Sequence, residues 1–237
     1  MATQTVYQFY AELEGYKPKI WRRFQVAGDT SVARLGYIVM TLYEMKASHL
    51  LAVEHERPLL TPSGRKSQRT ELIGRYSVPS EDNWSGADDE DATKTELAQL
   101  DLAPPSRLLV WYDFGDDWRV LVTLEKTVDH SDMSDKTLPC VLEGKGLGII
   151  EDCGGIWGLA DIADAFKAKK GKAYKHYSDW LGIDDLDMAA FDVDDMNFRL
   201  KKIPDIYAAI YEQKSYPTQA SINLIERKYL KKKATPD

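Results

Sequence analysis

Two runs rich in β-branched and aromatic residues flank a Gly-Asp turn near the middle of the chain, and this segment constrains the fold most strongly. Arg107–Phe114 and Trp118–Val128 are both typical of strands. Gly115 and Asp116 between them form a tight-turn signal, because both residue types tolerate the dihedral angles of short turns. The segment therefore predicts an antiparallel hairpin.

A second hairpin is predicted near the beginning of the chain. Val6–Glu14 and Ile20–Val26 mix aromatic and alternating apolar residues, and Gly15–Pro18 between them is typical of a turn. Ser31 is a residue type that caps helices, and the apolar residues of Val32–Met45 recur at helical spacing. The order strand, strand, helix follows from these patterns.

The next part of the chain changes in composition. His49–Val53 predicts a short third strand. Residues 56–105 then carry many prolines and glycines and an acidic block at 81–91. These features predict an exposed, partly mobile excursion with one short helix near Thr95–Leu100.

The second half of the chain is expected to be mainly helical. Pro139–Asp152 is rich in glycine and predicts a loop. The predicted helices after it are Leu159–Lys169, Tyr174–Leu181, Asp192–Lys202, Pro204–Glu212 and Thr218–Lys233. The predicted fold class is α+β: a β-grasp-like mixed sheet of two hairpins plus one helix, followed by a helical C-terminal half.

Composition excludes several classes of protein. The net charge of −7 argues against a general nucleic-acid binder, because phosphate contacts need clustered Lys and Arg. Two cysteines in 237 residues do not make a disulfide framework. The first residues lack a signal-peptide pattern and no apolar run approaches the about 20 residues of a membrane span, so we expect a cytoplasmic protein without a membrane partner.

Several short sequence blocks lie between Tyr7 and about Leu200. Their combination and order are specific, although no single block is. The blocks are Ile20–Arg23, Ser48–Leu50, Tyr112–Trp118, Cys140, Glu151–Gly158, Trp180–Gly182 and Phe191–Asp194. Together they resemble the plasmid proteins named after the third open reading frame of an Ri plasmid, a family that includes insertion-element passenger proteins. The resemblance implies an α+β fold and a mobile-element setting, and it implies no particular reaction.

The resemblance also divides the chain and exposes two departures. It implies a family-like domain at 1–200, including the excursion at 56–105, and a helical extension at 201–237 with a basic end. The family has a second histidine where this chain has Leu51, and prolines where it has Ile149 and Ile150. A metal ligand would be missing here if the family's two histidines held a metal.

The turn segment Tyr112–Trp118 concentrates three carboxylates, those of Asp113, Asp116 and Asp117. Clustered carboxylates could hold Mg²⁺ or act as an acid–base pair. Alternatively, they serve the turn itself, because Asp side chains accept hydrogen bonds from nearby backbone N–H groups. We favour the turn interpretation.

The Glu151–Gly155 block places two acids and a thiol beside two glycines. A nucleophilic Cys153 would need a base to form its thiolate, and His49 is the candidate. A structural turn that closes over the second hairpin is the alternative that we favour. Cys140 and Cys153 lack paired zinc-ligand spacing, although His49 and an aspartate could complete a mixed site.

Arginine on the second strand has two interpretations of equal weight. Trp21 and Arg23 share one face of that strand and Arg22 takes the other. The arginines could clamp a phosphate, or they could brace the two hairpins by pairing with aspartate. Of the other residues, His55, His130 and His176 are predicted at the surface, and Trp111, Trp118, Trp157 and Trp180 are predicted core anchors.

Two functions remain open from the sequence. The first is a non-enzymatic binding module whose partner is a protein or a nucleic acid, the latter through Arg227, Lys228, Lys231, Lys232 and Lys233. The alternative is a metal-dependent hydrolase of phosphoesters. No cofactor is predicted beyond an optional divalent metal. The candidate pocket residues are Arg22, Arg23, His49, Tyr112, Asp113, Asp116, Asp117, Trp118, Glu151, Asp152 and Cys153.

Overall fold

The structure is a computed structural model that describes residues 5–60, 66–79, 88–129 and 137–228. The strands are β1 (Thr5–Leu13), β2 (Trp21–Ala27), β3 (Leu51–Leu60), β4 (Lys66–Ser77), β5 (Glu90–Asp91), β6 (Arg107–Tyr112), β7 (Trp118–Asp129) and β8 (Cys140–Lys145). The helices are α1 (Val32–Leu42), the 3₁₀ helix η1 (Leu97–Leu100), α2 (Gly155–Ala168), α3 (Gly171–Leu181), α4 (Val193–Leu200), α5 (Ile203–Gln213) and α6 (Gln219–Ile225).

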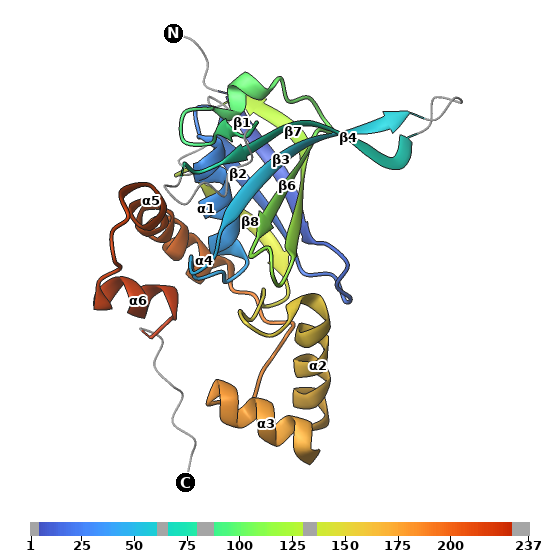
Figure 1. Cartoon of the computed structure of the whole chain (residues 1–237), viewed down its shortest axis with the longest axis vertical. Coiled ribbons are helices and arrows are strands. Elements are labelled where there is room, and N and C mark those ends of the chain that lie inside the picture. The colour runs from blue at the N-terminus through green and yellow to red at the C-terminus, as the bar shows by residue number, and fades with distance from the viewer. Residues whose placement is uncertain (1–4, 61–65, 80–87, 130–136, 229–237) are drawn as a thin grey trace.

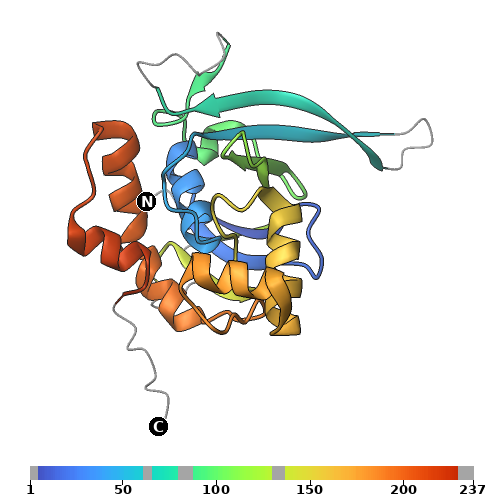
Figure 2. The same cartoon turned by 60° about the horizontal axis from the view of Figure 1, so that its bottom comes forward.

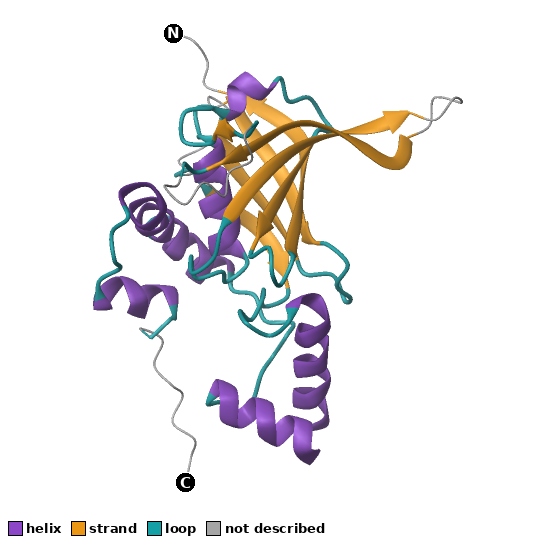
Figure 3. Cartoon of the chain, viewed as in Figure 1, coloured by secondary structure: helices purple, strands orange, loops and turns teal. Residues whose placement is uncertain are grey.

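One eight-stranded sheet has the order β5-β4-β3-β6-β7-β1-β2-β8 (Figure 1). Its pairs are antiparallel except for the parallel pair of β4 with β5, so the sheet is mixed. Figure 3 shows the strands as one curved layer with helices beside it and beyond one end. The α+β class is confirmed, whereas the narrower β-grasp-like description stays a prediction.

Both predicted hairpins are present. β1 pairs with β2 from Val6↔Ala27 to Glu12↔Trp21, and β6 pairs with β7 from Arg107↔Thr123 to Tyr112↔Trp118. β1 also pairs with β7, which joins the two hairpins into one sheet. The ends of β6 and β7 therefore meet at the predicted Gly-Asp turn.

Helix α1 is the helix around which the core is built. The Ser31 hydroxyl caps it by accepting a hydrogen bond from the Arg34 N–H (3.1 Å), as the sequence predicted. Ten of its eleven residues are buried, which follows from packing against β3 on one side and against α4 and α5 on another. The Tyr37 ring stacks on Tyr211 of α5 at 5.5 Å between centroids.

The excursion predicted at 56–105 contains two long strand segments that the sequence analysis did not predict. β3 continues to Leu60 instead of ending at Val53, and β4 pairs with it in an antiparallel ribbon. Figures 1 and 2 show this ribbon extending beyond the body of the sheet. β4 carries few apolar residues because the β3–β4 ribbon has little protein to cover it, so it lacked the alternation that identifies a strand. The short helix is confirmed as η1.

The predicted loop at Pro139–Asp152 is partly an edge strand. β8 pairs with β2, and its outer edge is covered where the Asn197 side chain exchanges two hydrogen bonds with the Val141 backbone (2.8 and 3.0 Å). Helix α2 begins at Gly155, four residues before the prediction. Figure 2 shows α2 and α3 side by side at the end of the molecule nearest the viewer.

Three single-residue predictions were wrong. Trp157 is 79% exposed and Trp180 is 45% exposed, so neither is a core anchor, because α2 and α3 lie at one end of the sheet. His55 is only 8% exposed, because β4 and β6 flank it as partners of β3. Trp118 is buried and His176 is exposed, as expected, and His130 lies outside the described residues.

The C-terminal helices join the same core as the sheet. Ile203 and Tyr207 of α5 and Ile225 of α6 belong to the main hydrophobic cluster. The division at residue 200 stays a prediction. The last helix is shorter than predicted, and Lys231, Lys232 and Lys233 lie outside the described residues.

Arg227, one of the residues predicted to contact a nucleic acid, is held by two acidic side chains of the protein. Its side chain pairs with Glu44 (2.5 Å) and with Asp195 (2.7 Å), and so it fastens the end of α6 to the rest of the protein. Within the described residues, no helix is both long and apolar enough to cross a membrane.

Candidate functional site

Three of the predicted site residues converge where the β6–β7 turn meets two loops. The Nε2 atom of His49 lies 3.5 Å from an Asp113 carboxylate oxygen and 3.4 Å from an Asp152 carboxylate oxygen. One ligand atom from each of the three residues lies within 4.8 Å of the others. We call this group the histidine–carboxylate cluster.

Asp113 is positioned by the end of β6. Its backbone N–H donates to the Leu50 carbonyl (3.0 Å), and its φ of 51° places it in the left-handed region that Asp tolerates better than most residues. One carboxylate oxygen accepts from the Gly115 N–H (3.1 Å), which is the turn role that the sequence predicted. The other oxygen faces His49, so one side chain serves both the turn and the cluster.

His49 lies between α1 and β3, and its neighbours fix its backbone and its ring. The Tyr211 hydroxyl donates to the His49 carbonyl, and the imidazole meets the Tyr112 ring edge-on at 5.8 Å between centroids. The Nε2 atom has no hydrogen-bond partner in the part of the chain that the structure describes, although it is shielded from solvent. An unsatisfied ring nitrogen facing two carboxylate oxygens suits a cation, or a proton shared with them.

The loop before α2 carries Asp152, whose φ is 60° and whose side chain is 72% exposed. Asp116 accepts a hydrogen bond from the Gly154 N–H (3.2 Å), which ties this loop to the β6–β7 turn. Gly155 has a φ of 69°, and a Cβ atom there would lie 2.4 Å from the Asp116 carbonyl oxygen. Only glycine permits this close approach.

Glu151, next to Asp152 in the chain, is a buried acid that holds neighbouring segments together. It is 8% exposed and accepts hydrogen bonds from the Lys46 N–H (2.5 Å), the Ser48 hydroxyl (2.6 Å) and the Tyr112 hydroxyl (2.6 Å). Burial, and then the charge of Glu151, raises the pKa of Tyr112, so the phenol stays a donor. These bonds hold the segment before His49 against β6.

Cys153 does not have the properties of a nucleophile. Burial, and then the nearby charge of Asp116, raises the pKa of its thiol to about 12. The thiol donates to the Gly155 carbonyl (3.5 Å). Cys140 is buried in β8 and its thiol faces the Gln25 side chain, so the mixed zinc site with both cysteines is not formed.

Arg22 serves the fold and does not join the cluster. It is completely buried, and its guanidinium donates to five backbone carbonyl groups, with a carbon 4.0 Å from the centre of the Phe191 ring. Burial lowers its pKa to about 10. The accepting residues are Trp21, Leu42, Lys145, Gly146 and Leu147.

The other predicted residues also lie outside the cluster. Arg23, on the opposite face of β2, pairs with Glu125 (2.6 Å) and with Glu143, so the arginine bracing uses glutamate and not the Asp turn. Asp117 pairs with Arg119 (2.8 Å). Trp118 is part of the core.

A cavity of about 570 Å³ opens beside the cluster. Its walls include Glu151, Asp152, Lys46 and Trp180, but neither His49 nor Asp113. The cluster and this cavity therefore share Asp152. The sequence prediction missed Ser48 and Tyr211, although the spacing of Tyr207 and Tyr211 on an apolar helix was a signal that both rings face the core.

The fold and the site define an α+β protein with a large mixed sheet and a histidine–carboxylate cluster at one end of it. The chain belongs to the family of plasmid pRiA4b ORF-3-like proteins, whose model matches residues 5–197. It is 24% identical over 204 residues to the uncharacterized protein y4hQ of Sinorhizobium fredii (strain NBRC 101917 / NGR234), a match that covers 86% of this chain and 93% of that protein.

A solved structure has a similar fold. It is the crystal structure of protein MM3350 from Methanosarcina mazei Go1, which is described as being of unknown function. The TM-score is 0.66 at 26% sequence identity, over 81% of this chain and 97% of the other. The family match over residues 5–197 confirms the recognition of the family from its sequence blocks.

Proposed function

We propose that the chain is a non-enzymatic binding module that holds a divalent cation at His49, Asp113 and Asp152. The observation that carries the proposal is the orientation of the His49 Nε2 atom, which faces two carboxylate oxygens at 3.5 and 3.4 Å without a hydrogen bond. Three segments distant in sequence converge to make this arrangement, and each is fixed by backbone hydrogen bonds.

The spacing of the three ligand atoms supports a small transition-metal cation. Tetrahedral ligands on bonds of about 2.1 Å lie about 3.4 Å apart. The two separations from His49 match this distance, and the third, between the two carboxylate oxygens, is no more than 4.8 Å. One imidazole and two carboxylates suit Zn²⁺ or Mn²⁺ better than Ca²⁺, which takes six to eight oxygen ligands. Leu51, at the position of the family's second histidine, packs against Gly36 of α1.

Calorimetric titration of the full chain with Zn²⁺ and with Mn²⁺ tests the proposal. We expect one bound ion, and His49→Ala should weaken binding by more than the about 10-fold to 100-fold that loss of an outer-shell partner costs. Asp113→Asn should do the same while keeping the turn, because asparagine retains an acceptor oxygen for Gly115 and tolerates a positive φ.

Two substitutions serve as matched controls. His176→Ala removes an exposed histidine of α3, and Asp117→Asn removes a carboxylate of the same turn that lies outside the cluster. Both should bind the metal like the parent chain. Absence of binding of either ion at millimolar concentration, or an equal loss in the control variants, would refute the proposal.

A metal-dependent phosphoesterase is the second candidate function. Its support is the ligand count, because three protein ligands leave one position of a tetrahedral site for water. Against it, Glu151 already accepts three hydrogen bonds and the Cys153 thiol has a pKa of about 12, so neither acts as a base at neutral pH. Turnover of bis(p-nitrophenyl) phosphate that needs added Zn²⁺ or Mn²⁺ and is lost in Asp113→Asn would favour this candidate.

A further inference from the structure

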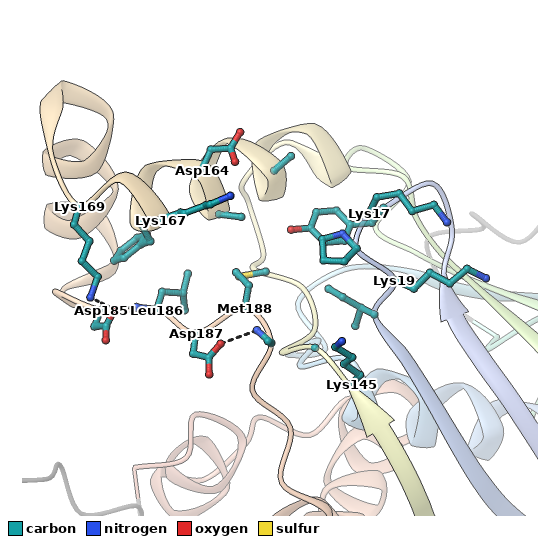
Figure 4. A pocket seen from close by; sticks show the side chains of 18 residues that line it. Lys17, Lys19, Lys145, Asp164, Lys167, Lys169, Asp185, Leu186, Asp187 and Met188 are labelled. Carbon is teal, nitrogen blue, oxygen red and sulfur yellow. Dashed lines mark hydrogen bonds and ion pairs between the residues drawn. The ribbon is translucent and has the colours of Figure 1, made fainter.

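A second, larger pocket lies away from the cluster, between α2 and the sheet (Figure 4). Its volume is about 730 Å³, within the range of about 300–1,000 Å³ that is usual for small-molecule sites. It is formed by α2, the β1–β2 turn, the end of β8 and residues 185–189. None of the cluster residues lines it. We call it the lysine-rimmed pocket.

The inner walls of the lysine-rimmed pocket are apolar. Leu186 and Met188, from the segment that passes beneath α2 (Figure 4), and Ala160 and Ala163 of α2 are partly exposed there, whereas Ile20 and Phe166 are almost completely buried. The Tyr16 ring adds an aromatic wall from the β1–β2 turn. Walls of this kind bind the hydrocarbon or aromatic body of a ligand through burial of apolar surface.

Five lysines surround these walls in a chain whose net charge is −7. Two of them are neutralised, because Lys19 pairs with Glu12 and Lys169 pairs with Asp185 (2.9 Å). Within the described residues, the other three form no ion pair, and they come from the β1–β2 turn, the end of β8 and α2. These three are Lys17, Lys145 and Lys167.

The lysines of the rim are not equally placed to meet a ligand. Figure 4 shows Lys17 and Lys19 extending away from the pocket, whereas Lys167 reaches along α2 towards it and Lys145 lies below Met188. Lys145 and Lys167 therefore offer two ammonium groups on either side of the apolar walls. A negatively charged group that meets either ammonium group would gain a charge-assisted hydrogen bond.

We propose that the lysine-rimmed pocket binds a small amphipathic monoanion, an organic carboxylate with an apolar body. The apolar walls are complementary to the apolar body, and the ammonium groups of Lys145 and Lys167 are complementary to the carboxylate. The carboxylates of Asp164, Asp185 and Asp187 on the same rim disfavour a polyanion such as a nucleoside triphosphate, because like charges repel.

Calorimetric titration of the full chain with dodecanoate below its micellar concentration tests the inference. Dodecyltrimethylammonium has the same body with the opposite charge, and acetate has the head without the body. We expect dodecanoate to bind and the other two probes to bind at least about tenfold more weakly, since each discriminating interaction is worth about 1.4 kcal/mol or more. Equal affinity for the cationic probe would overturn the proposal, as would no heat from dodecanoate at two well-separated temperatures, since burial of an apolar body can be heatless at one of them.

Two kinds of variant locate the site. The double variant Lys145→Gln/Lys167→Gln should weaken dodecanoate binding at least about tenfold, whereas Lys172→Gln, an exposed lysine of α3 outside the pocket, should not. Ala163→Phe should fill the pocket from α2 and reduce binding without a change of charge. Thermal unfolding of each variant confirms folding, and the glutamine variants decide the matter if Ala163→Phe does not fold. Equal losses in the double variant and in Lys172→Gln would refute the site.

Discussion

The Asp116 carboxylate accepts a hydrogen bond from the Gly154 N–H at 3.2 Å, and this contact ties the β6–β7 turn to the loop that carries Asp152. Asp113 and Asp152 belong to these two segments and face the same histidine nitrogen. The relative position of two cluster carboxylates thus depends on a third carboxylate that is not part of the cluster. Asp116 is a positioning residue in our proposal.

Asp116→Ala is expected to weaken Zn²⁺ binding about tenfold, in the manner of other outer-shell partners, and to destabilise the fold by about 1 kcal/mol. The physical reason is loss of the hydrogen bond that holds the Asp152 loop. Calorimetry and urea unfolding measure the two effects. Asp117→Asn is the control, because it removes the charge of a neighbouring exposed carboxylate that pairs with Arg119, and asparagine tolerates the positive φ of this position. Similar metal affinities of these two variants would contradict the positioning role.

Two adjacent glycines of the Asp152 loop separate two energetic effects: the cost of a positive φ, and the cost of a side chain where the loop approaches the β6–β7 turn. Gly154 and Gly155 both have a positive φ, of 86° and 69°. A Cβ atom added at Gly154 would meet nothing within 4 Å, whereas one added at Gly155 would lie 2.4 Å from the Asp116 carbonyl oxygen. Gly154→Ala should cost about 1–2 kcal/mol from the positive φ alone. Gly155→Ala should cost clearly more and weaken Zn²⁺ binding as well. Equal unfolding free energies would show that the loop shifts freely.

The fold was predictable for strands in which apolar and polar residues alternate, and the prediction failed for strands without this pattern. β1, β2, β6 and β7 are central strands with apolar residues facing the core, and their patterns predicted both hairpins. β4 and β8 lie at or near the two sides of the sheet, where fewer side chains are buried. Apolar and polar residues alternate along a strand when one of its faces is buried. A strand with little buried surface lacks this alternation and is not identified by it.

The chemistry of the site was partly predictable, but its assembly was not. Local sequence predicted that Asp113 stabilises a turn and that the glycines after Cys153 allow close approach; Asp113 does so, and Gly155, unlike Gly154, lies close to Asp116. The convergence of His49 with Asp113 and Asp152 depends on how distant segments pack. The role of Arg22 was open for the same reason, because the carbonyl groups around it come mainly from the end of β8, the residues just after it and the end of α1.

Arg22→Met is expected to destabilise the fold by about 3–5 kcal/mol, because it leaves buried carbonyl groups without a donor. Arg22→Lys should also be costly, since one ammonium group cannot reproduce the planar fork that reaches five carbonyl groups. Arg23→Met on the same strand is the matched control, and its half-exposed pair with Glu125 should be worth less than about 1 kcal/mol. Urea unfolding of the three variants measures the difference, and near-equal losses at the two arginines would contradict the buried role of Arg22.

The burial of His55 in β3 is expected to make the stability of the protein depend on pH. Burial, and then the positive charge of Arg57, lowers its pKa below the ordinary value of 6.5. The unfolded chain therefore takes up a proton before the folded chain does, so the stabilisation is complete above pH 6.5 and is lost as the pH falls towards the folded pKa. We expect His55→Gln to lose less unfolding free energy than the parent chain between about pH 7.5 and about pH 5.5, while His176→Gln, at an exposed position, follows the parent. Urea unfolding at the two pH values measures this, and identical slopes for His55→Gln and the parent would show that His55 is not the group responsible.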